Sequence, residues 1–88
     1  DTWTGKGVHA LKGAAILADA LRTTSARTGV MIEIKAKGIA QQIFRTVQEV
    51  QFSGPVIYAS FFHDELLTVR HEDPQAQTLA LIDAVPVD

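Results

Sequence analysis

The sequence contains no cysteine and no long apolar run. Without cysteine, a disulfide scaffold and a thiolate metal site are both excluded. The same absence agrees with a reducing compartment and favours the cytoplasm over secretion. No stretch of about 18 apolar residues occurs, so no membrane-spanning helix is predicted. A basic segment followed by an apolar one is also missing, so no signal peptide is indicated.

A cluster of basic residues along the sequence is also missing. The formal net charge is -2 and the basic residues form no run, so we expect no nucleic-acid partner. With 88 residues, 47% hydrophobic and 20% charged, the composition is that of one small globular domain. The single methionine is Met31 and the chain begins at Asp1, so we expect residues 1–88 to be a single fragment cut from a longer polypeptide.

The most informative stretch is Gly29–Lys37, with the sequence GVMIEIKAK. Its alternation predicts a strand with one apolar face, on which Val30, Ile32 and Ile34 would lie. Glu33 and Lys35 fall on the other face, and charged side chains are seldom buried unless they are paired or bind something. Two interpretations stay open at this point: a half-exposed strand with a solvent-facing side, or charged side chains that point into the mouth of a barrel.

Apolar spacing predicts helices and strands on both sides of this strand. Turn-rich residues Asp1–Gly7 read as a flexible entry segment, because they lack the glycine spacing of a phosphate-binding loop. The further elements expected are a helix over Val8–Arg22, a loop over Thr23–Gly29, a helix from Ile39 to about Phe52, a buried strand over Val56–Ser60, a helix over Asp64–His71 and a strand over Thr78–Ile82.

This order of elements predicts an α/β fold. Strands joined by single helices imply right-handed crossovers and a parallel sheet. The three expected strands give three βα units, whereas a closed β/α-barrel needs eight units and about 200 or more residues. The sheet is therefore either an arc of a barrel or a small open sheet with two exposed edges.

Two segments together resemble the middle of the glycerophosphodiester phosphodiesterases. They are GVMIEIK with its following helix, and PVIYASFFHDELLTVRHEDPQAQTLALI. That family has an apolar-Glu-apolar-Lys strand, then a strand that ends in Ser-Phe, a helix with a Leu-Leu/Arg pattern, an Asp-Pro turn and another short strand. The resemblance covers about Val30 to Ile82.

The resemblance implies three βα units of a TIM (β/α)8-type barrel, with the site at the carboxyl ends of the strands. It implies a metal-dependent phosphodiesterase of lipid metabolism, which hydrolyses glycerophosphodiesters to an alcohol and glycerol phosphate. Glu33 matches a ligand of a divalent cation, Ca²⁺ or Mg²⁺, and Lys35 matches the lysine that contacts the substrate phosphate. Ser60 and Phe61 match the Ser-Phe pair and are expected to form a pocket wall.

The family's catalytic histidines are not matched. The His-Arg-Gly segment, the acidic metal pair and the His-Asp pair that begin the family pattern do not occur here. No catalytic role is therefore assigned to His9, and His63 and His71 are expected to be surface residues. We expect the 88-residue chain alone to be inactive.

Two other interpretations stay open. One is a different phosphate-binding β/α-barrel, in which Lys35 binds phosphate and no metal is needed. The other is a non-catalytic small α/β module that self-associates through its sheet edges. An open sheet would expose edges and an apolar face, so we expect either the remainder of a barrel or a second copy to cover them.

Overall fold

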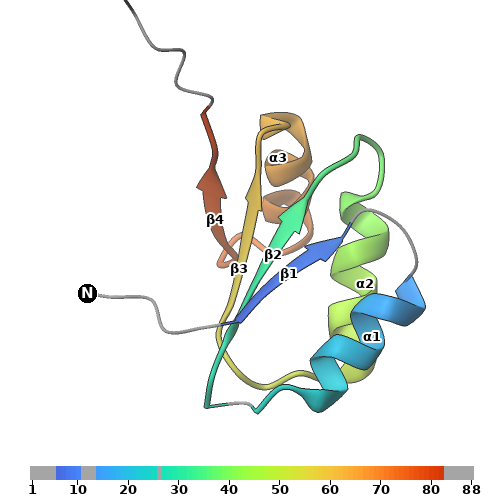
Figure 1. Cartoon of the computed structure of the whole chain (residues 1–88). Coiled ribbons are helices and arrows are strands. Elements are labelled where there is room, and N and C mark those ends of the chain that lie inside the picture. The colour runs from blue at the N-terminus through green and yellow to red at the C-terminus, as the bar shows by residue number, and fades with distance from the viewer. Residues whose placement is uncertain (1–5, 11–13, 26, 83–88) are drawn as a thin grey trace, which may run out of the picture.

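The computed structural model describes residues 6–10, 14–25 and 27–82, with side chains from residue 17 onward (Figure 1). Strands and helices alternate along the chain. They are β1 (Lys6–Ala10), α1 (Ala14–Thr23), β2 (Val30–Ile34), α2 (Ala40–Val50), β3 (Val56–Ser60), α3 (His63–Glu72) and β4 (Gln77–Ala80).

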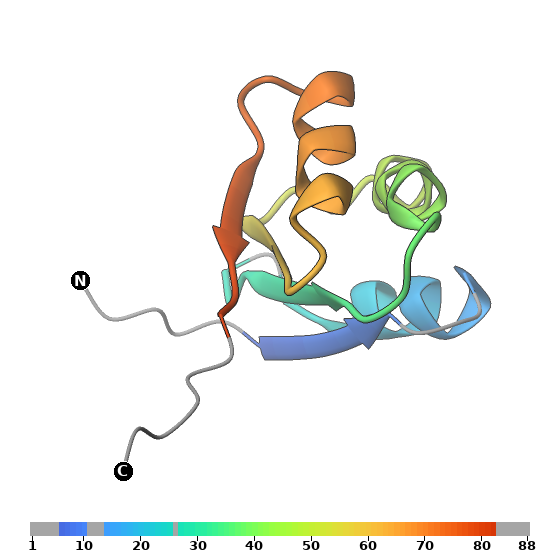
Figure 2. The same ribbon diagram turned by 90° about the horizontal axis from the view of Figure 1, so that it is seen from above.

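The strands form one parallel sheet in the order β1-β2-β3-β4, so each strand pairs with the next one in the sequence. Right-handed crossovers between strands that are added in one direction place every helix on the same side. Figures 1 and 2 show α1, α2 and α3 on one side of the sheet. No described helix or strand covers the opposite side, which we call the open face.

The core lies between the sheet and the helices. Val30, Ile32 and Ile34 are at most 1% exposed, whereas the intervening Met31 and Glu33 are half-buried. The strand alternation therefore separates an inner face from the open face. The same cluster includes, from the helices and β3, Leu17, Leu21, Ala40, Ile43, Phe44, Val47, Tyr58, Leu66 and Val69.

The prediction of a parallel α/β sheet is confirmed. Strands begin at Val30, Val56 and Gln77, as the sequence pattern indicated to within one residue. α2 ends at Val50 rather than about Phe52, because Gln51 adopts the left-handed conformation at φ 59° and its N–H bonds Gln48 O. β4 begins one residue before the expected Thr78 and ends at Ala80.

The expected helix over Val8–Arg22 is wrong at its start. Residues 6–10 form β1, which pairs with β2 from Lys6↔Val30 to Ala10↔Ile34, and the helix described begins at Ala14. Apolar spacing alone favours a helix here, but pairing with β2, whose inner face is buried, outweighs that weak local preference. Lys6 and Gly7 belong to β1 rather than to the expected entry segment Asp1–Gly7. The rest of that segment, residues 1–5, and residues 11–13 lie outside the described residues.

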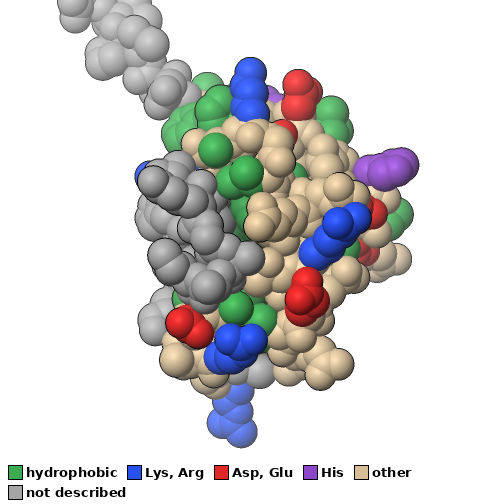
Figure 3. Space-filling model, turned by 90° about the vertical axis from the view of Figure 1, so that its right-hand side faces the viewer, with side chains coloured by type: hydrophobic (Ala, Val, Ile, Leu, Met, Phe, Trp, Pro, Cys, Tyr) green, Lys and Arg blue, Asp and Glu red, His purple; other side chains and the backbone are tan. Residues whose placement is uncertain are grey.

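Within the described residues the sheet therefore has four strands rather than the three expected, and it is open, with β1 and β4 at its edges. Figure 3 shows the helix-covered side, where basic and acidic side chains are interspersed rather than gathered by sign. Within the described ranges, no helix combines the length and the apolar character that crossing a bilayer requires.

Candidate functional site

The candidate site lies at the carboxyl end of β2. Glu33 is the fourth residue of the strand, and Lys35 follows its last residue directly. The Lys35 ammonium lies 3.9 Å from Glu33 Oε2, and these side chains are 42% and 23% exposed respectively. Since Val30, Ile32 and Ile34 occupy the inner face, the alternation directs Glu33 to the open face. Partial exposure leaves both charged groups accessible to a ligand.

Ser60, the last residue of β3, ties this end of β2 to the next turn. It is completely buried, and its Oγ donates to Ile34 O at 2.7 Å. The same oxygen accepts the N–H of Phe62 at 2.9 Å. Because Ile34 O belongs to the peptide that precedes Lys35, Ser60 fixes the backbone on which Lys35 is carried. Its hydroxyl is already used, so any contribution to a pocket wall comes from holding the turn.

A cavity of about 350 Å³ opens beside this turn. It is lined by Lys37 from the loop after β2 and by residues 61–65 from the start of α3. Phe61 is 46% exposed, and the Lys37 ammonium lies 5.6 Å from the centroid of the Phe62 ring, within cation–π range. Gly38 allows the loop to turn here, because its φ of 81° is strained for any side chain.

Glu65 holds the loop from the other side. This buried carboxylate on α3 accepts the N–H groups of Ile39 and Ala40, both at 3.0 Å, through Oε1. Ile39 provides no side-chain cap for α2, so Glu65 supplies the acceptor that the first turn lacks. A residue distant in sequence therefore fixes the start of α2 and the end of the loop that carries Lys35 and Lys37.

The donor set for a divalent cation is incomplete within the described residues. No group of three His, Cys, Asp or Glu side chains is close enough to hold a metal there. Ca²⁺ takes about six to eight oxygen ligands and Mg²⁺ about six. Glu33 can supply one carboxylate, so the described side chains do not fit a metal site by themselves.

Sequence reasoning placed four residues at this end of the sheet: Glu33, Lys35, Ser60 and Phe61. The structure brings Glu33 and Lys35 together and links Ser60 to the same strand end. In the register, His9 of β1 is the partner of Glu33. The ring of His63 is exposed and bonds Leu81 O at 3.0 Å, and His71 is exposed on α3.

Lys37, Phe62 and Glu65 were not predicted. The two-residue spacing of Lys35 and Lys37 is visible in the sequence and could have indicated Lys37. Nothing in the local sequence indicates Glu65, because its partners lie 25 and 26 residues away.

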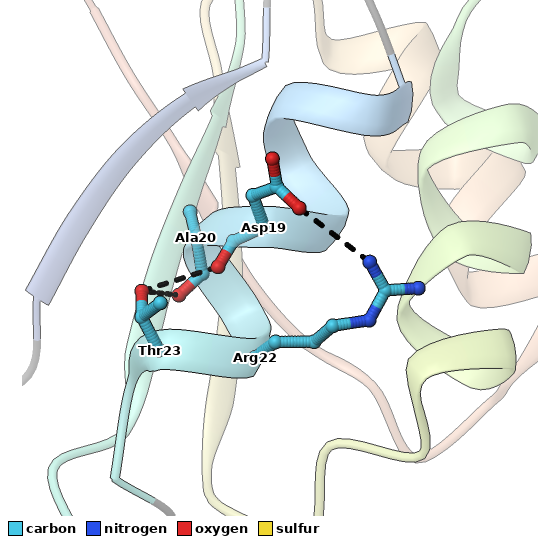
Figure 4. A network of polar contacts seen from close by, with 4 residues as sticks. All are labelled: Asp19, Ala20, Arg22 and Thr23. Atoms are coloured by element: carbon cyan, nitrogen blue, oxygen red, sulfur yellow. Dashed lines mark hydrogen bonds and ion pairs between the residues drawn. The ribbon is translucent and has the colours of Figure 1, made fainter.

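A second polar network lies at the end of α1 and does not extend to this site. Arg22 pairs with Asp19 at 3.5 Å, and the Thr23 hydroxyl donates to Asp19 O and Ala20 O (Figure 4). All these contacts are three or four residues apart and involve exposed side chains of α1, so they stabilise the last helical turn locally.

Comparison with protein-family models, curated proteins and solved structures found no match to this chain. The resemblance to the glycerophosphodiester phosphodiesterases therefore rests on the motif residues alone and stays a hypothesis.

Proposed function

We propose that this chain is part of a β/α-barrel phosphodiesterase of the glycerophosphodiester phosphodiesterase type. The observation that carries the proposal is the position of Glu33 and Lys35, 3.9 Å apart at the carboxyl end of β2 and away from the core. Active sites of β/α-barrels lie at the carboxyl ends of the parallel strands. The topology of the described residues is also compatible with a barrel, because the strands follow one another in sequence order and the helices lie on one side of the sheet.

Lys35 is the proposed phosphate contact. Its ammonium provides a positive charge and three N–H donors to a phosphodiester, which remains anionic at neutral pH. Ser60 holds the preceding peptide, so the lysine is carried on a backbone fixed before a ligand arrives. Phe61 is the proposed wall for the non-reacting part of the substrate, a glycerophosphodiester that is cleaved to an alcohol and glycerol phosphate.

Glu33 is the proposed ligand of a divalent cation, Ca²⁺ or Mg²⁺. When bound, such an ion polarises phosphoryl oxygens and neutralises developing charge. Glu33 is half-buried at the strand end, where one carboxylate oxygen is 3.9 Å from Lys35. The other ligands and the groups that transfer protons would have to come from outside the described residues.

The test is hydrolysis of glycerophosphocholine by the polypeptide of the complete reading frame that contains this chain. We expect glycerol phosphate and choline as products, loss of turnover with a chelator, and recovery with Ca²⁺ or Mg²⁺. Glu33→Gln should lower turnover about 10²-fold or more, whereas Glu49→Gln, an exposed side chain on α2, should not. Absence of these products under every metal condition would contradict the proposal.

A second candidate is a phosphate-binding β/α-barrel that needs no metal. It is favoured by the donor set around Glu33, which is incomplete among the residues that the structure describes. Turnover or phosphate binding that survives the chelator and Glu33→Gln but is lost in Lys35→Met would support this alternative.

A third candidate is a non-catalytic α/β module that self-associates. Its support is the exposure of apolar side chains on and after the edge strand β4: Leu79 is 45% exposed and Ile82 is 80% exposed. An unpaired sheet edge with apolar side chains recruits other chains. Light scattering that gives a dimer or larger species for the 88-residue chain, together with no phosphate binding, would support this alternative.

A further inference from the structure

A second cavity lies at the opposite end of the sheet, where β3 and β4 begin. Its volume is about 380 Å³, and it shares no lining residue with the cavity beside Lys37. The lining comes from the end of α2, the start of β3 and the turn between α3 and β4. It consists of Phe44, Val47, Gln48, Gln51, Phe52, Gly54, Pro55, Val56, Tyr58, Asp73, Gln75, Ala76 and Gln77.

The lining combines aromatic rings with one negative charge. Phe44, Phe52 and Tyr58 supply the rings, and the Phe44 and Tyr58 centroids lie 6.3 Å apart with a 45° tilt. Among the described residues that line the cavity, Asp73 is the one that carries a charge, and none is basic. Neutral polar groups are added to the lining by four glutamine side chains, Gln48, Gln51, Gln75 and Gln77. The volume of about 380 Å³ lies within the range of about 300–1,000 Å³ that is typical of small-molecule sites.

Tyr58 presents a polar group that the described part of the chain does not satisfy. The residue is 3% exposed, and its hydroxyl makes no hydrogen bond with another described residue. No completely buried side-chain oxygen in the described residues lacks a partner, so the Tyr58 hydroxyl oxygen retains some exposed surface, and Tyr58 lines the cavity. Burial, and secondarily the Asp73 carboxylate, raise the pKa of the Tyr58 hydroxyl, which therefore stays protonated at neutral pH.

Asp73 is held in place before any ligand arrives. Its N–H donates to Val69 O at 2.9 Å at the end of α3, and its carbonyl accepts the N–H of Ala76 at 2.9 Å. Its Oδ1 also accepts the N–H of Gln75 at 3.0 Å. The turn therefore fixes the carboxylate, and Oδ2 makes no hydrogen bond with another described residue.

We propose that this cavity binds a small organic ammonium ion with an apolar body. Aromatic rings that line a site attract a cation through their quadrupoles, and the fixed carboxylate adds a charge of the complementary sign. The apolar side chains around the rings, Val47 and Val56 among them, remove the body of the ligand from water. This inference is independent of the proposed phosphodiesterase activity, because it uses the other end of the sheet.

The experiment is an amide chemical-shift titration of the 88-residue chain with benzylammonium, with benzyl alcohol as the neutral probe of similar shape. We expect saturable shifts at residues 51–58 and 73–77 and at least threefold tighter binding of benzylammonium. Asp73→Asn keeps the acceptor for Gln75 and removes the charge, so it should weaken benzylammonium binding about threefold to fivefold and leave benzyl alcohol unchanged. The matched control Asp64→Asn, on the first turn of α3 outside the cavity, should bind as the unmodified chain does.

The salt dependence of the binding affinity tests the same proposal on the unmodified chain. Raising NaCl from about 20 to 500 mM should weaken benzylammonium binding and not that of benzyl alcohol. Equal affinities for the two probes at low salt would overturn the proposal. So would saturable shifts confined to the carboxyl end of the sheet, or benzylammonium binding that Asp73→Asn leaves unchanged in a folded chain.

Discussion

The two faces of β2 differ in almost every physical respect. On the inner face, Val30, Ile32 and Ile34 are at most 1% exposed and pack against side chains from the helices. On the open face, Met31 and Glu33 are half-buried, and Lys35 follows on the same alternation. One short strand therefore contributes both to the hydrophobic core and to the candidate site.

The difference shows how stability and binding can be divided between alternate residues. The inner face stabilises the folded chain because its apolar side chains are removed from water, and this contribution involves no charged group. The open face keeps a carboxylate and an ammonium near water, where they can act on a ligand. Substitutions on the inner face should therefore change the free energy of unfolding, and substitutions on the open face should mainly change binding.

The largest effect is expected from Ile32→Ala. Ile32 is 0% exposed, so the change removes buried apolar groups and leaves a cavity. We expect a loss of about 2–5 kcal/mol in the free energy of unfolding, measured by urea denaturation. The matched change on the open face, Met31→Ala, should cost about 1 kcal/mol or less. Equal losses would break the division between the two faces.

A smaller loss in the free energy of unfolding is expected for Glu65→Ala, which removes a carboxylate from the helix side of the sheet. The change leaves the N–H groups of Ile39 and Ala40 without their acceptor. An unpaired buried donor costs about 1–3 kcal/mol. Only the Ala40 bond is fully buried, whereas the Ile39 bond is part-buried and its N–H can bond water instead, so we expect a total destabilisation of about 1–3 kcal/mol. Glu72→Ala, which removes an exposed bond to Gln41, should cost less than about 0.5 kcal/mol. If the two variants unfold at the same urea concentration, Glu65 does not hold the loop.

Alkaline pH should produce a smaller effect through Tyr58, on the inner face of β3. Its pKa is raised in the folded chain above the ordinary value of 10.0, by burial first and by Asp73 second. The unfolded chain therefore releases this proton first, and the stabilisation from the neutral hydroxyl is complete below pH 10 and is lost as pH rises further. Urea denaturation between pH 8 and 11 should show a steeper fall for the unmodified chain than for Tyr58→Phe. Parallel curves would contradict the burial of this hydroxyl.

The last prediction concerns the 88-residue chain alone, for which we expect no measurable phosphodiesterase turnover. Positioned acid and base groups contribute about 10²–10⁴-fold in rate, and none is assigned here. Glycerophosphocholine hydrolysis by the purified chain is the measurement. Turnover that Glu33→Gln abolishes would show that the open face carries a complete site.

The two faces of β2 could be predicted from the sequence, because alternation along a strand is a local property that Val30, Ile32 and Ile34 express clearly. β1 could not, because residues 6–10 are too short for a strong alternation and their strand depends on pairing with β2. At the site, the spacing of Glu33 and Lys35 predicted their proximity. The contacts of Ser60 and Glu65 depend on residues 25 and 26 positions away, which local patterns do not encode.

The most direct test of the division between core and site uses Lys35→Met in the polypeptide of the complete reading frame. The measurement is the rate of glycerol phosphate release from glycerophosphocholine, with urea denaturation of the same samples as the control. We predict that turnover falls about 10²-fold or more while the free energy of unfolding changes by less than about 0.5 kcal/mol. Full turnover in a folded Lys35→Met protein would contradict the assignment of the open face of β2 to phosphate binding.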